Sequence, residues 1–345
     1  SLSLLAMILD SLLIDSFQAI FKNAKKLVIT NHMNPDGDAM GSALGLAGVL
    51  EKKGFEVQVI VPNPYPSFLY WMNGDHKVMV YETNEEACDL ILKESDLIIH
   101  LDYNALHRSG AMQGILETVS AKRMMIDHHQ QPDNFPDATY SDTSMSSTCE
   151  MVFHLIDGLG WADKISKKEA ECLYTGIVTD TGGFRFGSTS PITHQVASRL
   201  LEMGVRPQDI ASRVYDTNSQ ERLKLLSRAL ENMEIIPDFN AAIINLSKED
   251  LKEFNFKKGD TEGFVNYGLS VSGIKLSVFL AEKDGLIKMS FRSKGDFDVN
   301  KLARKHFNGG GHINAAGGAT SEGLLDTINK LKSVLPDYKT ELEND

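Results

Sequence analysis

The segment that most constrains the fold of this chain is LVITNHMNPDGDAMG, residues 27–41. Its aliphatic and β-branched start, Leu27–Thr30, predicts a short strand, and Gly41 begins a helical pattern that ends at Gly54. Between them lies a turn with three side chains of the kinds that bind metal ions: His32, Asp36 and Asp38. In open α/β sheets, ligands bind beyond the carboxyl ends of the strands. The turn is therefore a candidate binding site.

A turn rich in Asn, Pro, Asp and Gly also forms without a metal, so this segment alone leaves two interpretations open. The pattern recurs, however, at three further points where an apolar run ends in acidic residues or histidines. DLIIHLD ends in Asp102, RMMIDHH ends in Asp127, His128 and His129, and the helical run ECLYTGIVTD ends in Asp180. Four such ends favour one shared metal site over four unrelated turns.

The donor types point to a pair of divalent cations. Carboxylate and imidazole together suit Mn(II), Fe(II), Zn(II) or Co(II), whereas a site made only of oxygen atoms suits Mg(II). One glycine separates Asp36 from Asp38, so the two carboxylates can point to different sides of the turn. A carboxylate shared by two ions holds them about 3.5–4 Å apart, the arrangement used for displacement at phosphorus. We expect Asp102 to be that bridge.

Strand and helix patterns alternate through the first half of the chain. The run at 96–102 is apolar almost throughout, which is typical of a strand covered on both faces in a parallel sheet. From Ser146 the pattern is mainly helical, and past Pro237 it changes to strands with a hairpin signal at 283–285. We expect an α/β fold: a doubly wound, mostly parallel N-terminal sheet with flanking helices, and a smaller C-terminal α+β domain.

The length of the chain and the change of pattern at Pro237 predict two domains. We expect a catalytic, metal-binding domain over 1–217, a helical linker over 218–237 and a substrate-binding domain over 238–345, with the active-site cleft between the two domains. The linker contains a helical pattern at 219–235. The charged tail from Asp337 is expected to be frayed.

Composition narrows the classes of partner. The net charge of −12 argues against capture of long duplex DNA, which depends on clustered Lys and Arg. No stretch approaches the roughly 20 apolar residues of a membrane span. The apolar run Ser1–Leu9 lacks the basic start and cleavage site of a secretion signal, and the three cysteines show no metal-ligand spacing. We expect a cytoplasmic protein without a membrane partner; a homodimer is compatible with the sequence.

A second constellation is FNGGGHINAAGG, residues 307–318. Its consecutive glycines, among them Gly310 and Gly311, expose backbone N–H groups that can approach a ligand, and His312 adds a donor. Arg292, at the end of a neighbouring strand pattern, would add a phosphate clamp if it faced the same cleft. The alternative for the glycine-rich segment is a flexible loop, and the alternative for Arg292 is an exposed strand residue.

Several motifs together resemble the DHH phosphoesterase family with its DHH-associated C-terminal domain. They are NHMNPDGDAMGS, LDYN, DHH, GIVTDTGGFRF and GGGH, and they span nearly the whole chain in the family's order. Within that family, HRSG at 107–110 and SSTCE at 146–150 are most similar to the bacterial nanoRNase and 3′-phosphoadenosine 5′-phosphate phosphatase group.

The resemblance implies roles for individual residues. One metal would be held by His32, Asp36 and Asp102, and the second by Asp38, Asp102, His128 and Asp180. His129 would contact phosphate or donate a proton to the leaving group, Asp127 would orient the histidines, and Arg108 would add a phosphate contact. The metal would be manganese. Gly310, Gly311, His312 and Arg292 would form the wall that holds the substrate.

These expectations lead to a phosphoric ester hydrolase that uses a water activated by two metal ions. Its substrates would be short single-stranded oligoribonucleotides, cleaved as by a 3′-5′ exonuclease, and the nucleotide bisphosphate 3′-phosphoadenosine 5′-phosphate. A terminal base could stack on Phe184 or Phe186, although such aromatics are more often core residues. The alternatives are a phosphodiesterase of linear or cyclic dinucleotides such as pApA or c-di-AMP, an inorganic pyrophosphatase, and a nucleotide sensor without catalysis.

Overall fold

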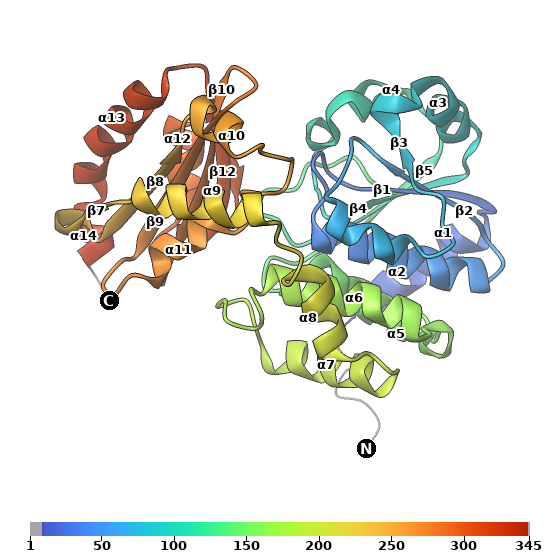
Figure 1. Ribbon diagram of the computed structural model, residues 1–345. Helices are drawn as coiled ribbons and strands as arrows, with labels where there is room; N and C mark the ends of the chain where they lie inside the picture. The colour runs from blue at the N-terminus through green and yellow to red at the C-terminus, as the bar shows by residue number, and fades with distance from the viewer. Residues whose placement is uncertain (1–8, 344–345) are drawn as a thin grey trace. The chain divides into compact units, whose positions relative to one another are not determined.

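The computed structural model describes residues 9–343 (Figure 1). The chain divides into two compact units, Ser1–Thr217 and Asn218–Asp345, which are described one at a time. Of the N-terminal run considered above, only Leu9 falls within the described residues. None of the helices formed by residues 9–343 is long and apolar enough to cross a membrane.

The first unit is built on a six-stranded sheet in the order β3-β2-β1-β4-β5-β6. Its strands are β1 (Lys26–Thr30), β2 (Glu56–Val61), β3 (Met79–Val80), β4 (Leu97–Leu101), β5 (Lys122–Asp127) and β6 (Ala138–Ser141). Every pairing is parallel, which confirms the predicted doubly wound sheet. Because β1 pairs with both β2 and β4, the strand order reverses beside β1, and such a point is where open α/β sheets bind ligands.

Helices cover both faces of this sheet (Figure 1). One face packs against α3 (Glu85–Glu94) and α4 (Gln113–Thr118). The helices on the other side are α1 (Ser11–Lys22), α2 (Gly37–Lys52), α5 (Thr148–Gly158), α6 (Lys167–Asp180), α7 (Pro191–Glu202) and α8 (Pro207–Val214). Short 3-10 turns are η2 (Ser67–Asn73), η3 (Tyr81–Thr83), η4 (Leu106–Met112) and η5 (Ala162–Lys164). Within β1, Leu27 and Ile29 face one helical layer and Val28 faces the other.

One predicted helix start in this unit was wrong. Helix α2 begins at Gly37, not Gly41, because the Asp36 side chain caps it by accepting hydrogen bonds from the amides of Asp38 and Ala39. Asp38 is therefore a helical residue. Gly110, with a φ of 58°, is not helical, and α4 begins only after η4.

Helix α2 packs closely against α6 through a row of glycines. A Cβ atom on Gly41 would lie 2.5 Å from the carbonyl oxygen of Cys172, and one on Gly48 would lie 2.3 Å from Glu169 Oε1. At the start of α2, a Cβ on Gly37 would collide with Thr179, the residue before Asp180. The missing side chains thus let the end of α6 approach the start of α2.

The second unit contains a mixed six-stranded sheet in the order β11-β12-β10-β9-β8-β7. Its strands are β7 (Glu234–Ile236), β8 (Ala241–Leu246), β9 (Leu276–Lys283), β10 (Leu286–Ser293), β11 (Gly310–Gly311) and β12 (Ala315–Thr320). Only β8 and β9 pair in parallel. Asp284 and Gly285, both with positive φ, form the predicted turn between β9 and β10.

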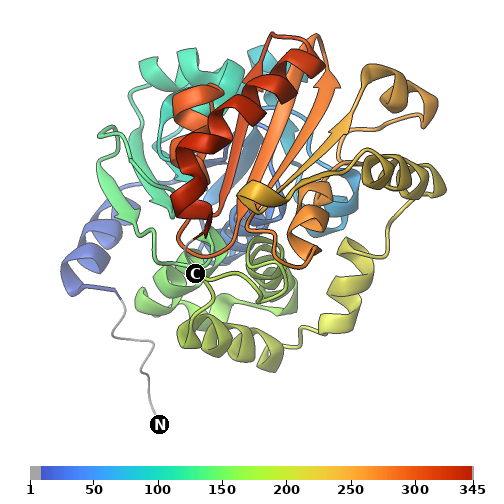
Figure 2. The ribbon, with the colours of Figure 1, turned by 90° about the vertical axis from the view of Figure 1, so that its left-hand side faces the viewer.

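The helices of this unit are α9 (Gln220–Glu231), α10 (Lys248–Glu253), α11 (Phe264–Ser270), α12 (Val299–His306), α13 (Leu324–Val334) and α14 (Lys339–Glu343), with 3-10 turns η6 (Pro237–Phe239) and η7 (Leu335–Tyr338). Alternate residues of β9 face different helices: Leu276 and Val278 belong to the cluster with α12 and α13, whereas Phe279 belongs to the cluster with α9, α10 and α11. Figure 2 shows α13, in red, across one face of this sheet.

Two predictions for this unit were wrong. The expected helix at 219–235 ends at Glu231, and residues 234–236 form strand β7, so the range predicted as a helical linker contains a helix and a strand of the second unit. The glycine-rich segment, for which a flexible loop was the alternative interpretation, includes strand β12. The tail expected to be frayed forms α14, because Leu342 is fully buried and its carbonyl accepts a hydrogen bond from Asn240.

Candidate metal centre

The first candidate ligand group lies beyond the adjacent ends of β1 and β4. The Nε2 atom of His32 lies 3.3 Å from Asp102 Oδ2 and 3.9 Å from Asp36 Oδ2. The other ring nitrogen, Nδ1, lies 2.9 Å from the carbonyl oxygen of Met33. If Nδ1 carries the proton, that bond leaves the Nε2 lone pair facing the carboxylates. His32, Asp36 and Asp102 can together hold one metal ion.

The second candidate ligand group surrounds His128, which follows β5. Its Nε2 atom lies 3.7 Å from Asp38 Oδ2, 3.6 Å from Asp102 Oδ1 and 3.4 Å from Asp180 Oδ2. Its Nδ1 atom lies 3.1 Å from the carbonyl oxygen of Met145, which orients the ring. Asp38, Asp102 and His128 can hold a metal ion. Asp180 Oδ2 lies beside the same Nε2 atom of His128 and can add a further oxygen ligand.

Asp102 connects the two groups because its two oxygen atoms face different histidines. Oδ2 lies toward His32 and Oδ1 toward His128. Its backbone has a φ of 64°, a left-handed conformation that costs a residue with a Cβ atom roughly 1–3 kcal/mol. The Asp102 amide donates to the carbonyl of Ile126, on the neighbouring strand β5. This geometry is the one that a bridging carboxylate needs.

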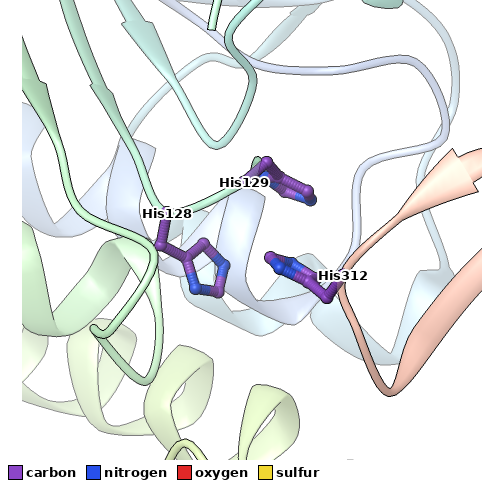
Figure 3. Close-up of side chains that lie close together, drawn as sticks. All are labelled: His128, His129 and His312. Atoms are coloured by element: carbon purple, nitrogen blue, oxygen red, sulfur yellow. The ribbon is translucent and has the colours of Figure 1, made fainter. Parts of the chain in front are cut away.

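His129, whose Nδ1 lies 3.8 Å from Asp102 Oδ1, is held by a chain of hydrogen bonds. Its Nδ1 lies 2.6 Å from Asp127 Oδ1, and its Nε2 lies 3.2 Å from a guanidinium nitrogen of Arg108. Arginine can only donate, so Nε2 accepts and Nδ1 carries the proton that it donates to Asp127. Burial, followed by the charge of Arg108, lowers the pKa of His129 well below its usual value. The planes of the His128 and His129 rings are inclined by 70° to each other. Figure 3 shows these two side chains.

The electrostatics of the centre favour a bound cation. Burial, reinforced by the charges of Asp38 and Asp36, raises the pKa of Asp102 well above its usual value. Burial would lower the pKa of His128, but Asp180, Asp38 and Asp102 outweigh it and raise this pKa to about 9. Asp180 also ends α6, where the helix dipole is negative. Divalent cations would compensate this accumulation of negative charge, so the donor set fits them.

Asn63, which the sequence did not single out, supports the turn after β1. The Asn34 amide donates to Asn63 Oδ1 at 2.7 Å, and Asn63 Nδ2 donates to Asn34 Oδ1 at 2.9 Å. Asn34 has a φ of 59°, so these bonds hold a left-handed residue in the middle of the turn. Asn63 follows β2, the strand beside β1, and that adjacency was the one signal in the sequence that could have identified it.

The remaining predicted site residues lie in the second unit. Arg292 pairs with Ala315 across β10 and β12, and the His312 amide donates to the Ala315 carbonyl at 2.7 Å. The Gly311 amide, expected to face a ligand, instead donates to Asn300 Oδ1 at 2.9 Å. A Cβ on Gly311 would lie 2.4 Å from the Ala315 carbonyl oxygen. This glycine is therefore required by close packing of the hairpin, and the side chains of Arg292 and His312 remain the candidate donors.

Comparison with protein families gives two matches along the chain. Residues 26–177 match the DHH family, N-terminal domain, and residues 240–338 match the DHHA1 domain. The first match contains every candidate ligand of the metal centre except Asp180, and the second contains Arg292 and His312.

Individual relatives cover most of the chain. The bifunctional oligoribonuclease and PAP phosphatase NrnA of Bacillus subtilis is 32% identical over 295 residues, which are 84% of this chain and 88% of that protein. The cyclic-di-AMP phosphodiesterase GdpP of Geobacillus thermodenitrificans is 26% identical over 94% of this chain but only 49% of its own length. A crystal structure of an exopolyphosphatase-related protein from Bacteroides fragilis has a TM-score of 0.93 and 42% identity, covering 98% of this chain and 99% of that one.

Proposed function

This chain belongs to the DHH family, and on that ground we propose that it is a metal-dependent phosphoesterase of short oligoribonucleotides and 3′-phosphoadenosine 5′-phosphate. The observation that carries the proposal is the convergence of carboxylates and imidazoles around Asp102 in a chain that is similar to NrnA over 88% of the length of that relative. We assign one metal ion to His32, Asp36 and Asp102 and a second to Asp38, Asp102, His128 and Asp180. The mixed oxygen and nitrogen donors suit manganese along with Fe(II), Zn(II) and Co(II), and manganese is the one that the resemblance to the family implies.

Two such cations would polarise a phosphoryl oxygen and lower the pKa of a water molecule between them. The chain's own residues hold the reacting groups in place. Arg108 offers a guanidinium to an equatorial phosphate oxygen, and Asp127 fixes the ring of His129. When Arg108 turns to the phosphate, His129 Nε2 loses that donor and one of the charges that lower its pKa, so that it can take up a proton from solvent and donate it to the leaving oxygen. His129 and Arg108 thus act as one unit in binding the scissile phosphate.

In the second unit, we assign Arg292 and His312 to a part of the substrate away from the scissile bond. Both side chains are half-buried and can donate hydrogen bonds to phosphate or base. Gly310 and Gly311 shape the hairpin that presents His312, since their pairing with β12 leaves no room for a side chain at Gly311. Cys88, Cys149 and Cys172 are buried free thiols, which supports action in the reducing cytoplasm.

A second candidate function is hydrolysis of dinucleotide signals, which the similarity to GdpP favours. That similarity spans only half of the relative, and its identity is lower than that to NrnA, so we place this activity second. The two functions share the same chemistry at phosphorus and differ in the length and ends of the substrate.

A substrate panel tests the proposal. The purified chain with manganese is offered RNAs of two to five nucleotides and one long RNA, 3′-phosphoadenosine 5′-phosphate, pApA, cyclic di-AMP and pyrophosphate. We expect loss of the short RNAs and of the bisphosphate, and no loss of either in the Asp102→Asn variant or with a chelator. Consumption of pyrophosphate alone would overturn the proposal, whereas exclusive use of cyclic di-AMP or pApA would establish the second candidate.

A further inference from the structure

The start of helix α5 supports both central carboxylates of the metal centre. Ser147 caps this helix by accepting a hydrogen bond from the Glu150 amide. The next two amides, which have no partner within a helix, point at Asp38: Thr148 N donates to Oδ2 at 2.7 Å and Cys149 N donates to Oδ1 at 2.8 Å. Both oxygens of Asp38 are thereby oriented, and the positive end of the helix dipole favours their charge.

Thr148 makes a second contact that backbone geometry does not require. Its hydroxyl donates to Asp102 Oδ1 at 3.0 Å. Oδ1 is the oxygen that faces His128, so the bond fixes Oδ1 toward the second ligand group and leaves Oδ2 toward His32. Thr148 is fully buried, and therefore solvent does not replace its hydroxyl.

Buried contacts of Glu150 and Cys149 hold the start of α5 in place. Glu150 is 1% exposed, and its Oε2 accepts hydrogen bonds from the hydroxyls of Ser146 and Thr193. Thr193 belongs to α7, so the carboxylate of Glu150 ties that helix to the residue just before the cap. Gly41 and Gly176 leave the space that Cys149 Sγ occupies, because a Cβ on either would lie within 3.0 Å of the sulfur. The position of Thr148 is thus determined by its contact with Asp38, by the hydrogen bonds of Glu150 and by the packing of Cys149.

We propose that Thr148 is a positioning residue that sets the orientation of Asp102, and so determines which oxygen each metal ion receives. Glu150, through Ser146 and Thr193, holds Thr148 in place. The inference rests on the proposed function, because it concerns cations at the same centre. It adds a residue that contacts a bridging ligand without touching metal or substrate. Hydrogen-bond partners of metal ligands typically change metal affinity about 10–100-fold when they are removed.

The test compares two threonine-to-valine variants of the full chain. Thr148→Val removes the hydroxyl but keeps the amide that binds Asp38. Thr327→Val, in α13 of the second unit, is the matched control: Thr327 is also fully buried, and its hydroxyl donates to the carbonyl of Gly323. Thr148→Ser restores a hydroxyl at the first position. Manganese binding is measured by calorimetry, fold stability by melting with a chelator, and turnover by kcat and KM on a dinucleotide.

We expect Thr148→Val to bind manganese about 10–100-fold more weakly than wild type and to lose kcat with little change in KM. Thr148→Ser should recover most of both losses, and Thr327→Val should bind manganese as wild type does. Because each valine variant loses one buried hydroxyl bond, the two should melt at similarly lowered temperatures in chelator.

Manganese affinity of Thr148→Val equal to wild type, or a loss that Thr148→Ser does not recover, would overturn the inference while the proposed function stands. A wild-type chain that binds no manganese at all would overturn the proposed function and the inference together. These outcomes are distinct because metal binding is measured directly and not through activity.

Discussion

The two ligand groups that share Asp102 differ in how they are built. The outer group, His32 and Asp36, is partly open: the Asp36 side chain is 47% exposed and already uses one oxygen to cap α2. The inner group, Asp38, His128 and Asp180, is mostly closed, with the Asp38 side chain 1% exposed and both its oxygens held by α5. A buried, preoriented group loses less freedom on binding a cation. We therefore expect the inner group to bind metal more tightly and the outer group to exchange it.

The same contrast appears in the groups that hold each aspartate. The outer turn is fixed mainly by the exchange of hydrogen bonds between Asn34 and Asn63. The inner group is fixed by the start of α5, by the hydroxyl of Thr148 and by the hydrogen bonds of Glu150. Burial raises the pKa of Asp38, so the inner group carries a cost of buried charge that a cation removes.

The largest effect is expected from Asp102→Asn, because this change weakens both groups at once. We expect hydrolysis of a dinucleotide to fall by about 10³-fold or more, since one preoriented electrostatic group is worth about 10²–10³. Calorimetry should show that manganese binding is weakened at both positions. Near-normal turnover in this variant would remove the basis for treating Asp102 as a bridge.

Asp38→Asn should damage only the inner group. We expect one manganese equivalent to be retained, at the outer group. Turnover should fall by at least about a hundredfold, which is the upper end of the loss seen when a hydrogen-bond partner of a metal ligand is removed. The measurement is metal stoichiometry by calorimetry together with kcat. Retention of two equivalents would show that the inner group does not need Asp38.

Asp36→Asn should have a smaller effect, and on the outer group alone. Asparagine caps helices about as well as aspartate, so α2 should keep its start and the melting temperature in chelator should change little. We expect weaker binding of the second manganese equivalent and activity that is largely recovered at higher manganese concentration. If excess metal does not recover activity, the outer group is not the exchangeable one.

The smallest effect is expected on the stability of the fold at acid pH, through the carboxyl group of Glu150. Burial would raise the pKa of Glu150, but the His154 ring, whose Nε2 lies 3.5 Å from Oε1, and hydrogen bonds from Ser146 and Thr193 outweigh it and hold this pKa below its usual value. A carboxyl group whose pKa is lower in the folded than in the unfolded protein stabilises the fold at pH values above its unfolded pKa, here about 4.5. This contribution is lost as the pH falls through the folded pKa.

The melting temperature in chelator should therefore fall more between pH 6 and pH 4 for wild type than for Glu150→Gln. We expect a difference of roughly 2–4 °C, which corresponds to about 1 kcal/mol in a unit of this size. Ser144→Ala, which removes an exposed hydroxyl near the same segment, is the control and should follow wild type. Parallel curves for wild type and Glu150→Gln would mean that Glu150 does not titrate in this range.

Much of the first unit could be predicted from local pattern. The near-continuous apolar run that ends in Asp102 predicted a parallel strand covered on both faces, and the run that ends in Asp127 predicted a second strand. These strands are β4 and β5, which pair in parallel. Their polar ends lie at one edge of the sheet because parallel strands present their carboxyl ends together. The predicted ligands were brought together for that reason.

Less of the second unit could be predicted. Leu342 appeared to lie in a charged tail, yet it is fully buried in the second unit, and residues 315–320 form β12 where no strand was predicted. In both places the decisive interaction is with a distant segment: β12 pairs with β10, and the Leu342 carbonyl accepts from Asn240. Local propensity does not contain such contacts.

The sequence alone determined the chemical identity of the centre, because residue types and their positions at the ends of apolar runs specify donors and the edge they share. Only the tertiary structure decided how each donor is oriented. Thr148 and Asp102 are 46 residues apart in the chain. The bond between them exists because α5 packs against α2 and against β5, the strand that pairs with β4. A hydrogen bond depends on ångström-scale placement of two atoms, and that placement results from packing of the whole unit.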